Sequence, residues 1–166
     1  MGIYVDCDVF CLKPLPERDY LFGWEQSHQI NNAVLNLPKD SELLQAMIAF
    51  TAQKYPIPPW LKPEKRIVLQ VRRAIGLPVH VARQSWGTYG PVALTYFIKK
   101  LGLAHHALPI DYFYAFYGNF WPLLAEEGLS LSDLITPRSY AIHLSASGLG
   151  DTKIKPRTPL AELVEA

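Results

Sequence analysis

The sequence predicts a single α/β domain, in which short apolar strands come before and after amphipathic helices. A chain of 166 residues is long enough for a real core, because a domain of this size buries roughly two-thirds of the surface of its unfolded chain. Hydrophobic residues make up 49% and charged residues 19%, as in a compact globular protein. The sequence has no internal repeat, low-complexity tract or clear domain boundary, so residues 1–166 are expected to form one unit.

Three strands are expected in the first part of the chain. Apolar and polar residues alternate over residues 3–9, which predicts a strand that runs into Asp6 and Asp8 and places both carboxylates on one side. Two further strands are expected at 20–24 and 30–37. Proline follows the first and the last of these strands and ends them, because it supplies no ladder donor.

Two helices follow from local start signals. Ser41 or Asp40 can cap a helix whose apolar residues recur at three-four spacing and which ends before the proline-rich loop at 56–63. Gly90 and Pro91 open another helix that extends to Gly102, since proline at the first helical position loses no hydrogen bond. After these helices, a short buried strand is expected at 139–144 and a turn or two of helix from residue 160.

A third helix is expected at 64–75, between those two. Its apolar residues share one face, which we expect to point inward: Ile67, Val68, Val71 and Ile75. The outer face carries Lys65, Arg66, Arg72 and Arg73, with Lys62 nearby. These cations suit a phosphate or an acidic acceptor, although basic residues on a helix are more often a solvated face.

Charge and cysteine content limit the classes of partner and compartment. A formal net charge of +1 gives no global field to attract nucleic acid, so no nucleic-acid partner is expected. No stretch approaches the roughly 18 apolar residues of a membrane span, and the expected location is the cytoplasm or the periphery of a membrane. Cys7 and Cys11 lie so close in sequence that a disulfide between them would not stabilise the fold, and both are expected to be reduced thiols.

The acidic pair carries the most chemical content. Two carboxylates one residue apart at a strand end, as in Asp6 and Asp8, can share a hard cation that also binds phosphate oxygens. Such an ion acts as a Lewis acid that neutralises a departing diphosphate. Because two unpaired carboxylates would repel each other, a cation or a hydrogen-bond donor must compensate them. The alternative is a pair that is simply solvated in a loop.

Four segments, in order, resemble glycosyltransferase family thirty-two. Residues 2–15, which contain Asp6-Cys7-Asp8, are similar to the family's sugar-binding region with its Asp-x-Asp motif. Asn31-Asn32-Ala33 resembles an Asn-Gly-Ala segment, and residues 86–95 resemble a Trp-Gly-x-x-Gly-Pro-x-x-Leu-Thr segment. Residues 139–144 resemble a late strand with a histidine near its end, and together the four matches cover most of residues 2–144.

The resemblance implies a GT-A-like fold, a Rossmann-like mixed sheet flanked by helices. In the family a nucleotide-binding half precedes the acidic motif, whereas here the motif begins at residue 6, so we expect this chain to hold the C-terminal portion of that fold only. The implied activity is metal-dependent, retaining transfer of a sugar from a UDP- or GDP-sugar to a saccharide or glycolipid acceptor. The implied cofactor is Mn²⁺ or Mg²⁺.

The same resemblance assigns roles to single residues. Asp6 and Asp8 would be catalytic and hold the metal, with Asp8 binding it directly, and His143 would be a third ligand. The substrate-binding residues would be Asn31, Asn32, Trp86, Gly90 and Pro91. The residue types leave simpler roles open, because a lone histidine on an apolar strand is often a core residue and asparagine commonly makes turns. Gly90 and Pro91 most simply start a helix.

Two other functions compete with the glycosyltransferase. An early strand that ends in Asp-x-Asp also opens haloacid-dehalogenase-type phosphatases, in which the first aspartate is the nucleophile, but the threonine expected after the pair is missing here. A non-enzymatic alternative is a truncated, inactive remnant that exposes apolar surface and acts as a folding or interaction partner. Its partners would be further copies of itself, as a homo-oligomer, or a complementing chain.

Overall fold

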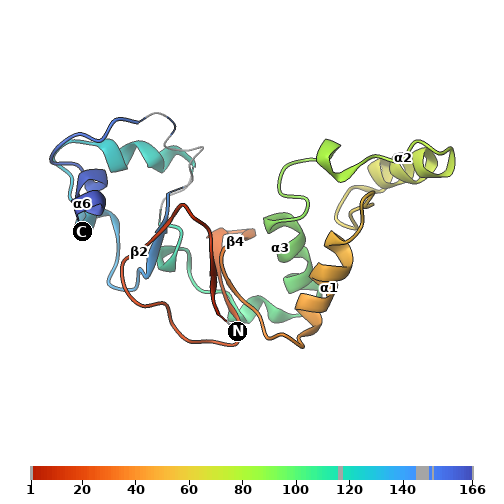
Figure 1. The fold of residues 1–166 in the computed structure, drawn as a ribbon, viewed down its shortest axis with the longest axis horizontal. Coiled ribbons are helices and arrows are strands. Elements are labelled where there is room, and N and C mark those ends of the chain that lie inside the picture. The colour runs from red at the N-terminus through yellow and green to blue at the C-terminus, as the bar shows by residue number, and fades with distance from the viewer. Residues whose placement is uncertain (1, 116–117, 145–149, 151, 166) are drawn as a thin grey trace.

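The protein has a mixed α/β fold, which confirms the coarse prediction of class (Figure 1). The computed structural model describes residues 2–115, 118–144, 150 and 152–165. Its strands are β1 Tyr4–Val5, β2 Val9–Cys11, β3 Leu21–Gln26, β4 Gln29–Asn36 and β5 Ala141–His143. Its α-helices are α1 Glu42–Thr51, α2 Pro63–Ala74, α3 Pro91–Lys100, α4 Leu131–Leu134 and α6 Pro159–Glu165. The 3₁₀ helices are η1 Val81–Arg83, η2 Leu103–His106, η3 Ile110–Tyr112 and η4 Gly118–Ala125.

The strands form two small sheets, one of three strands in the order β1-β4-β3 and one of two strands, β2-β5. All strand pairs in the described residues are antiparallel, and the parallel contact among them is an isolated bridge between Gly23 and Leu108. The structure therefore shows an α/β fold with small antiparallel sheets, and the strands of the described residues do not confirm the larger Rossmann-like sheet that the resemblance implies.

The expected first strand over residues 3–9 is divided at the acidic pair. β1 pairs with β4, whereas β2 leaves that sheet and pairs with β5 near the other end of the chain. Between them, the N–H of Val9 donates to the carbonyl of Asp6 at 3.2 Å and closes a turn. The prediction of one continuous strand was wrong because the two halves find partners in different sheets.

β3 and β4 form an antiparallel hairpin close to the predicted ranges, joined through residues 27–28. α3 packs on β4 and α1 packs on α3, so these two helices cover one face of the hairpin (Figure 1). The start signals of both helices are confirmed: the Ser41 hydroxyl accepts from the N–H of Leu44 at 3.2 Å, and Pro91 is the first residue of α3. The core on this side contains Phe22, Ile30, Leu37, Leu43, Leu94 and Ile98.

A buried hydroxyl fixes α3 against β4. The Thr95 hydroxyl accepts from the N–H of Ile30 at 2.9 Å and donates to the carbonyl of Pro91 at 2.6 Å. This contact places the first turn of α3 beside the middle of β4, where Asn31 and Asn32 lie.

The other face of the hairpin is covered by residues 108–114 and by β5. The Tyr114 hydroxyl accepts from the N–H of Val34 at 3.3 Å, and its ring is almost completely buried. The core on this side contains Leu21, Ala33, Val34, Leu108, Phe113, Tyr114 and Ala141. The three-stranded sheet therefore lies between two apolar layers.

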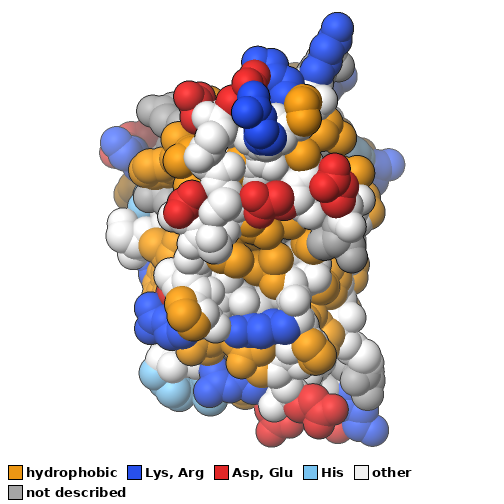
Figure 2. Space-filling view, turned by 90° about the vertical axis from the view of Figure 1, so that its left-hand side faces the viewer, with side chains coloured by type: hydrophobic (Ala, Val, Ile, Leu, Met, Phe, Trp, Pro, Cys, Tyr) orange, Lys and Arg blue, Asp and Glu red, His pale blue; other side chains and the backbone are white. Residues whose placement is uncertain are grey.

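The C-terminal part forms a third, smaller core around Leu124, Ile142, Leu160 and Leu163. Here α6, the helix expected from residue 160, packs against η4. Figure 2 shows acidic and basic side chains interspersed with apolar ones on this side of the molecule.

Helix α2 forms at the predicted place, but its apolar side chains do not point inward. Ile67, Val68, Val71 and Ile75 are each more than half exposed, and Leu69 is the partly buried residue of the helix. Among the described elements, none packs closely on α2, which lies at the end of the molecule opposite α6 (Figure 1). The prediction of an inward face was wrong, because the spacing of apolar residues shows that they share one side of a helix but not whether another element packs on that side. Within the described residues, no helix has the length and apolarity needed to cross a bilayer.

Candidate functional site

The turn that carries the acidic pair is anchored to both sheets. The N–H of Asp6 donates to the carbonyl of Ala33 in β4 at 2.8 Å. The carbonyl of Asp8 accepts from the N–H of Leu144, directly after β5, also at 2.8 Å. Because each aspartate is held by a different sheet, the positions of the two carboxylates are set by the junction of the sheets. The intervening Cys7 is exposed and, like Cys11, not disulfide-bonded.

His143 reaches the acidic pair from β5, where it lies opposite Val9. Its Nε2 atom is 3.4 Å from Oδ1 of Asp8, and its side chain is 13% exposed. The edge of its ring meets the ring of Tyr114, with 5.8 Å between the centroids. One ligand atom from each of Asp6, Asp8 and His143 lies within 4.8 Å of the others, so these three side chains could hold a metal ion.

A tyrosine orients the first aspartate. The Tyr4 hydroxyl donates to Oδ1 of Asp6 at 2.5 Å. This hydrogen bond and the negative charge of Asp6 raise the pKa of Tyr4 above its ordinary value, because both disfavour the phenolate. At neutral pH Tyr4 is therefore a hydrogen-bond donor that fixes one oxygen of Asp6.

The residues that the sequence singled out all line one pocket of about 520 Å³: Asp6, Asp8, Asn31, Asn32, Trp86, Gly90, Pro91 and His143. They come from the turn after β1, from β4, from the start of α3 with its preceding loop, and from β5. Asn31 is buried and its Oδ1 accepts from the N–H of Ala33 at 2.9 Å, so part of its carboxamide supports the strand.

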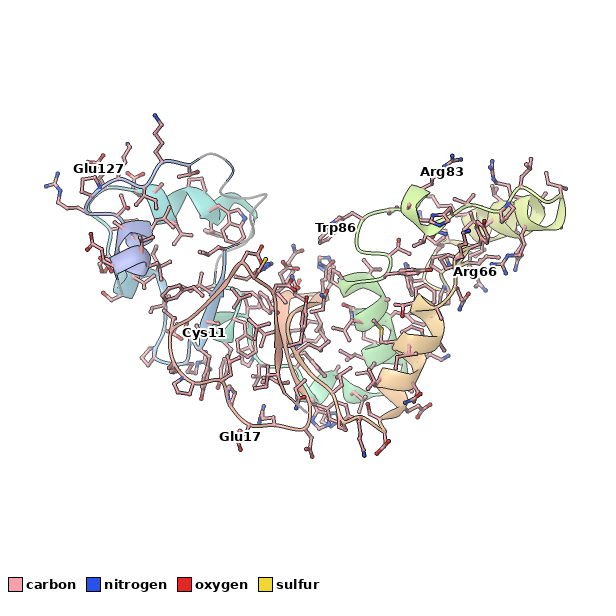
Figure 3. All side chains as sticks on the ribbon, in the orientation of Figure 1. Cys11, Glu17, Arg66, Arg83, Trp86 and Glu127 are labelled. Carbon is pink, nitrogen blue, oxygen red and sulfur yellow. The ribbon has the colours of Figure 1, made fainter. Side chains whose placement is uncertain are left out.

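Two glycines shape the wall opposite the acidic corner. Gly87 has a φ of +77°, which favours glycine, and it lets the loop turn into α3. A Cβ atom on Gly90 would lie 3.2 Å from Oδ1 of Asn32, so glycine allows the start of α3 to approach this carboxamide closely. On the rim, the Trp86 ring is 82% exposed and stands clear of its loop (Figure 3).

Besides Gly87, which belongs to the matched segment, the pocket is lined by two residues that sequence reasoning missed, Glu25 and Tyr89. Glu25 accepts a hydrogen bond from Gln29 at 2.9 Å. The Tyr89 hydroxyl is buried without a hydrogen-bond partner in the described residues, and burial raises its pKa. Tyr89 occupies a variable position of the matched segment, and Glu25 belongs to no motif, so neither gave a signal in the sequence.

We expect Tyr89→Phe to preserve or raise stability. A buried, unpaired hydroxyl is unfavourable, so its removal is expected to raise the free energy of unfolding by up to about 1 kcal/mol in urea titrations. Tyr96→Phe is the control, because Tyr96 packs on Trp60 outside this pocket. A clear loss of stability in Tyr89→Phe would mean that the hydroxyl has a partner within the protein.

Comparisons with protein-family models, with curated proteins and with solved structures find no match for this chain. The resemblance to glycosyltransferase family thirty-two therefore remains a prediction.

Proposed function

We propose that this pocket binds a nucleotide sugar through a divalent cation, and that the chain is the C-terminal portion of a GT-A-like, retaining glycosyltransferase. The acceptor would be a saccharide or a glycolipid. The observation that carries the proposal is that residues from four separate segments, to which the resemblance gives metal and substrate roles, line one pocket. Chance matches would place these residues on different parts of the surface as readily as in one pocket.

The three candidate ligands fit a hard cation in type and in spacing. An octahedral ion with ligands at about 2.1 Å separates its ligand atoms by about 3 to 4 Å, and those of Asp6, Asp8 and His143 lie within 4.8 Å of one another. Two carboxylates favour Mn²⁺ or Mg²⁺ over softer metals. When bound, such an ion would offset the negative charge of a departing diphosphate.

The opposite wall offers groups for the donor sugar. The carboxamide of Asn32 supplies both a donor and an acceptor, which suits sugar hydroxyls. The first turn of α3, at Gly90 and Pro91, presents the positive end of a helix, which favours a phosphate oxygen. The exposed ring of Trp86 at the rim suits stacking on a sugar or a base. A volume of about 520 Å³ lies within the range of small-molecule sites.

Calorimetric titration of the purified chain with UDP- and GDP-sugars tests the proposal. We expect binding in the presence of Mn²⁺ or Mg²⁺ and none after chelation with EDTA. Release of free nucleoside diphosphate in the presence of metal would then show turnover. Absence of binding to every nucleotide sugar under all these conditions would contradict the proposal, and hydrolysis of a simple aryl phosphate would assign the pocket to a phosphatase.

A further inference from the structure

Helix α2 lies at one end of the molecule (Figure 1), and it carries a stripe of apolar side chains that are exposed to solvent. Ile67, Val68, Val71 and Ile75 are 57%, 56%, 54% and 63% exposed. At 3.6 residues per turn these side chains share one face of the helix. Single exposed apolar residues are ordinary on protein surfaces, whereas a continuous exposed stripe marks an interaction surface.

The same helix concentrates positive charge. Residues 62–77 contain five cations, Lys62, Lys65, Arg66, Arg72 and Arg73, and one carboxylate, Glu64, although the whole chain has a net charge of only +1. By helical periodicity Lys65 and Arg72 follow one border of the stripe, and Arg66 and Arg73 lie on the opposite face. An apolar stripe combined with a basic face is the pattern of helices that lie in the interface of an anionic membrane.

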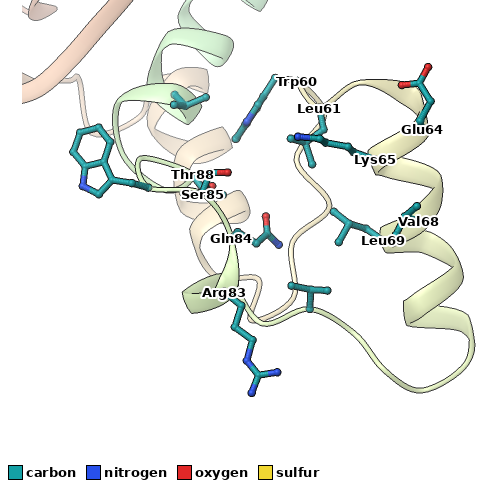
Figure 4. Close-up of a pocket in the computed structure, with 13 residues that line it drawn as sticks. Trp60, Leu61, Glu64, Lys65, Val68, Leu69, Arg83, Gln84, Ser85 and Thr88 are labelled. Carbon is teal, nitrogen blue, oxygen red and sulfur yellow. The ribbon is translucent and has the colours of Figure 1, made fainter.

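The inner side of α2 is only loosely attached to the rest of the protein. A groove of about 550 Å³ separates the helix from the loop at 83–88, and Leu69 and Trp60 lie along it (Figure 4). A hydrogen bond from the Arg73 guanidinium to the carbonyl of Tyr55 holds the end of the helix. Val68, at one edge of the stripe, lines this groove together with Leu69, and Arg73 lies on the opposite face of the helix, so Ile67, Val71 and Ile75 remain open to a partner.

We propose that α2 docks the protein on an anionic lipid surface, with the stripe in the headgroup boundary and the basic residues among the lipid phosphates. Charge decides between this partner and a second copy of the chain. Pairing two α2 helices would bring two strongly basic segments together, whereas an anionic bilayer neutralises the same charge. The proposal does not depend on the function of the pocket that contains Asp6.

Co-sedimentation of the full chain with lipid vesicles tests the inference. We expect binding to vesicles of equimolar phosphatidylcholine and phosphatidylglycerol, little binding to phosphatidylcholine alone, and release at high salt. The double variant Ile67→Ser, Val71→Ser should abolish binding. Each cation near the membrane surface raises the partition coefficient about five-fold. The double variant Arg66→Gln, Arg72→Gln should therefore lower the partition coefficient about thirty-fold.

Matched exposed positions provide the controls. Ile48 on α1 is 52% exposed, so Ile48→Ser shows how vesicle binding responds to the removal of an exposed apolar side chain outside the stripe. Lys39→Gln with Lys100→Gln removes two exposed cations elsewhere. Both controls should bind like the unmodified chain, and circular dichroism should show equal thermal midpoints for all variants.

Three results would overturn the inference: no binding of the unmodified chain to anionic vesicles, equal binding by the stripe variants, or a stable dimer in solution that the Ile67→Ser, Val71→Ser variant separates. The last result would assign the stripe to a second copy of the chain. Binding to an acidic polypeptide without binding to vesicles would assign it to a protein partner and also reject the lipid surface.

Discussion

Replacing Asp8 with asparagine is expected to abolish metal-dependent binding of a nucleotide sugar. Asparagine keeps the size of the side chain and removes the charge that lies 3.4 Å from His143 and faces the proposed ion. Since changes in residues that merely support a metal ligand already lower affinity 10- to 100-fold, loss of a direct ligand should lower Mn²⁺ affinity by at least about 100-fold. Calorimetry with Mn²⁺ alone, then with the nucleotide sugar, measures both effects.

Thermal unfolding separates this effect from damage to the fold. A ligand at about 100 times its dissociation constant stabilises the folded state by about 2.7 kcal/mol, so Mn²⁺ should raise the melting temperature of the unmodified chain and not that of Asp8→Asn. Without metal, the stability of the variant should stay within about 1 kcal/mol of the unmodified chain, because losing the repulsion from Asp6 offsets losing the contact with His143. Asp40→Asn is the control, since that side chain is 86% exposed and outside the pocket. Equal stabilisation of Asp8→Asn and the unmodified chain by Mn²⁺ would exclude the proposed ion site.

The sequence predicted those elements that depend on local signals. Ser41 caps α1 and the Gly90-Pro91 pair starts α3, because capping and the fixed φ of proline act within one turn. The hairpin of β3 and β4 was also near its predicted ranges. In contrast, the division of the first strand depends on the pairing of β2 with β5, which lies near the other end of the chain. A local sequence pattern does not show which distant strand will be the partner.

The sequence predicted which residues form the candidate site but did not predict the shape of the site. Ordered motif matches singled out Asp6, Asn32, Gly90 and His143, but their spacing in sequence gives no information that Gly90 closely approaches Asn32. That contact results from the packing of α3 on β4 through Thr95. Glu25 and Tyr89 could not be found in this way, because packing alone places them in the pocket.

Truncation of Tyr114 is expected to have the largest effect on stability. Its side chain is 1% exposed and lies between β4 and β5, so Tyr114→Ala should lower the free energy of unfolding by about 3–5 kcal/mol in urea titrations. Tyr114→Phe keeps the ring and removes the hydroxyl that accepts from the N–H of Val34, and it should lower the free energy by about 1 kcal/mol. Trp86→Ala is the control, because the exposed ring of Trp86 should contribute less than about 0.5 kcal/mol.

The two Tyr114 variants also test whether this core residue holds His143 in position for the metal. The Tyr114 ring meets the edge of the His143 ring at 89°, so it limits how that imidazole can turn. Tyr114→Phe retains the ring and should retain Mn²⁺ affinity, whereas Tyr114→Ala should lose affinity even where most molecules remain folded, because His143 is then free to leave Asp8. Equal Mn²⁺ affinity in the two variants would show that the imidazole is held without the ring, or that it is not a ligand.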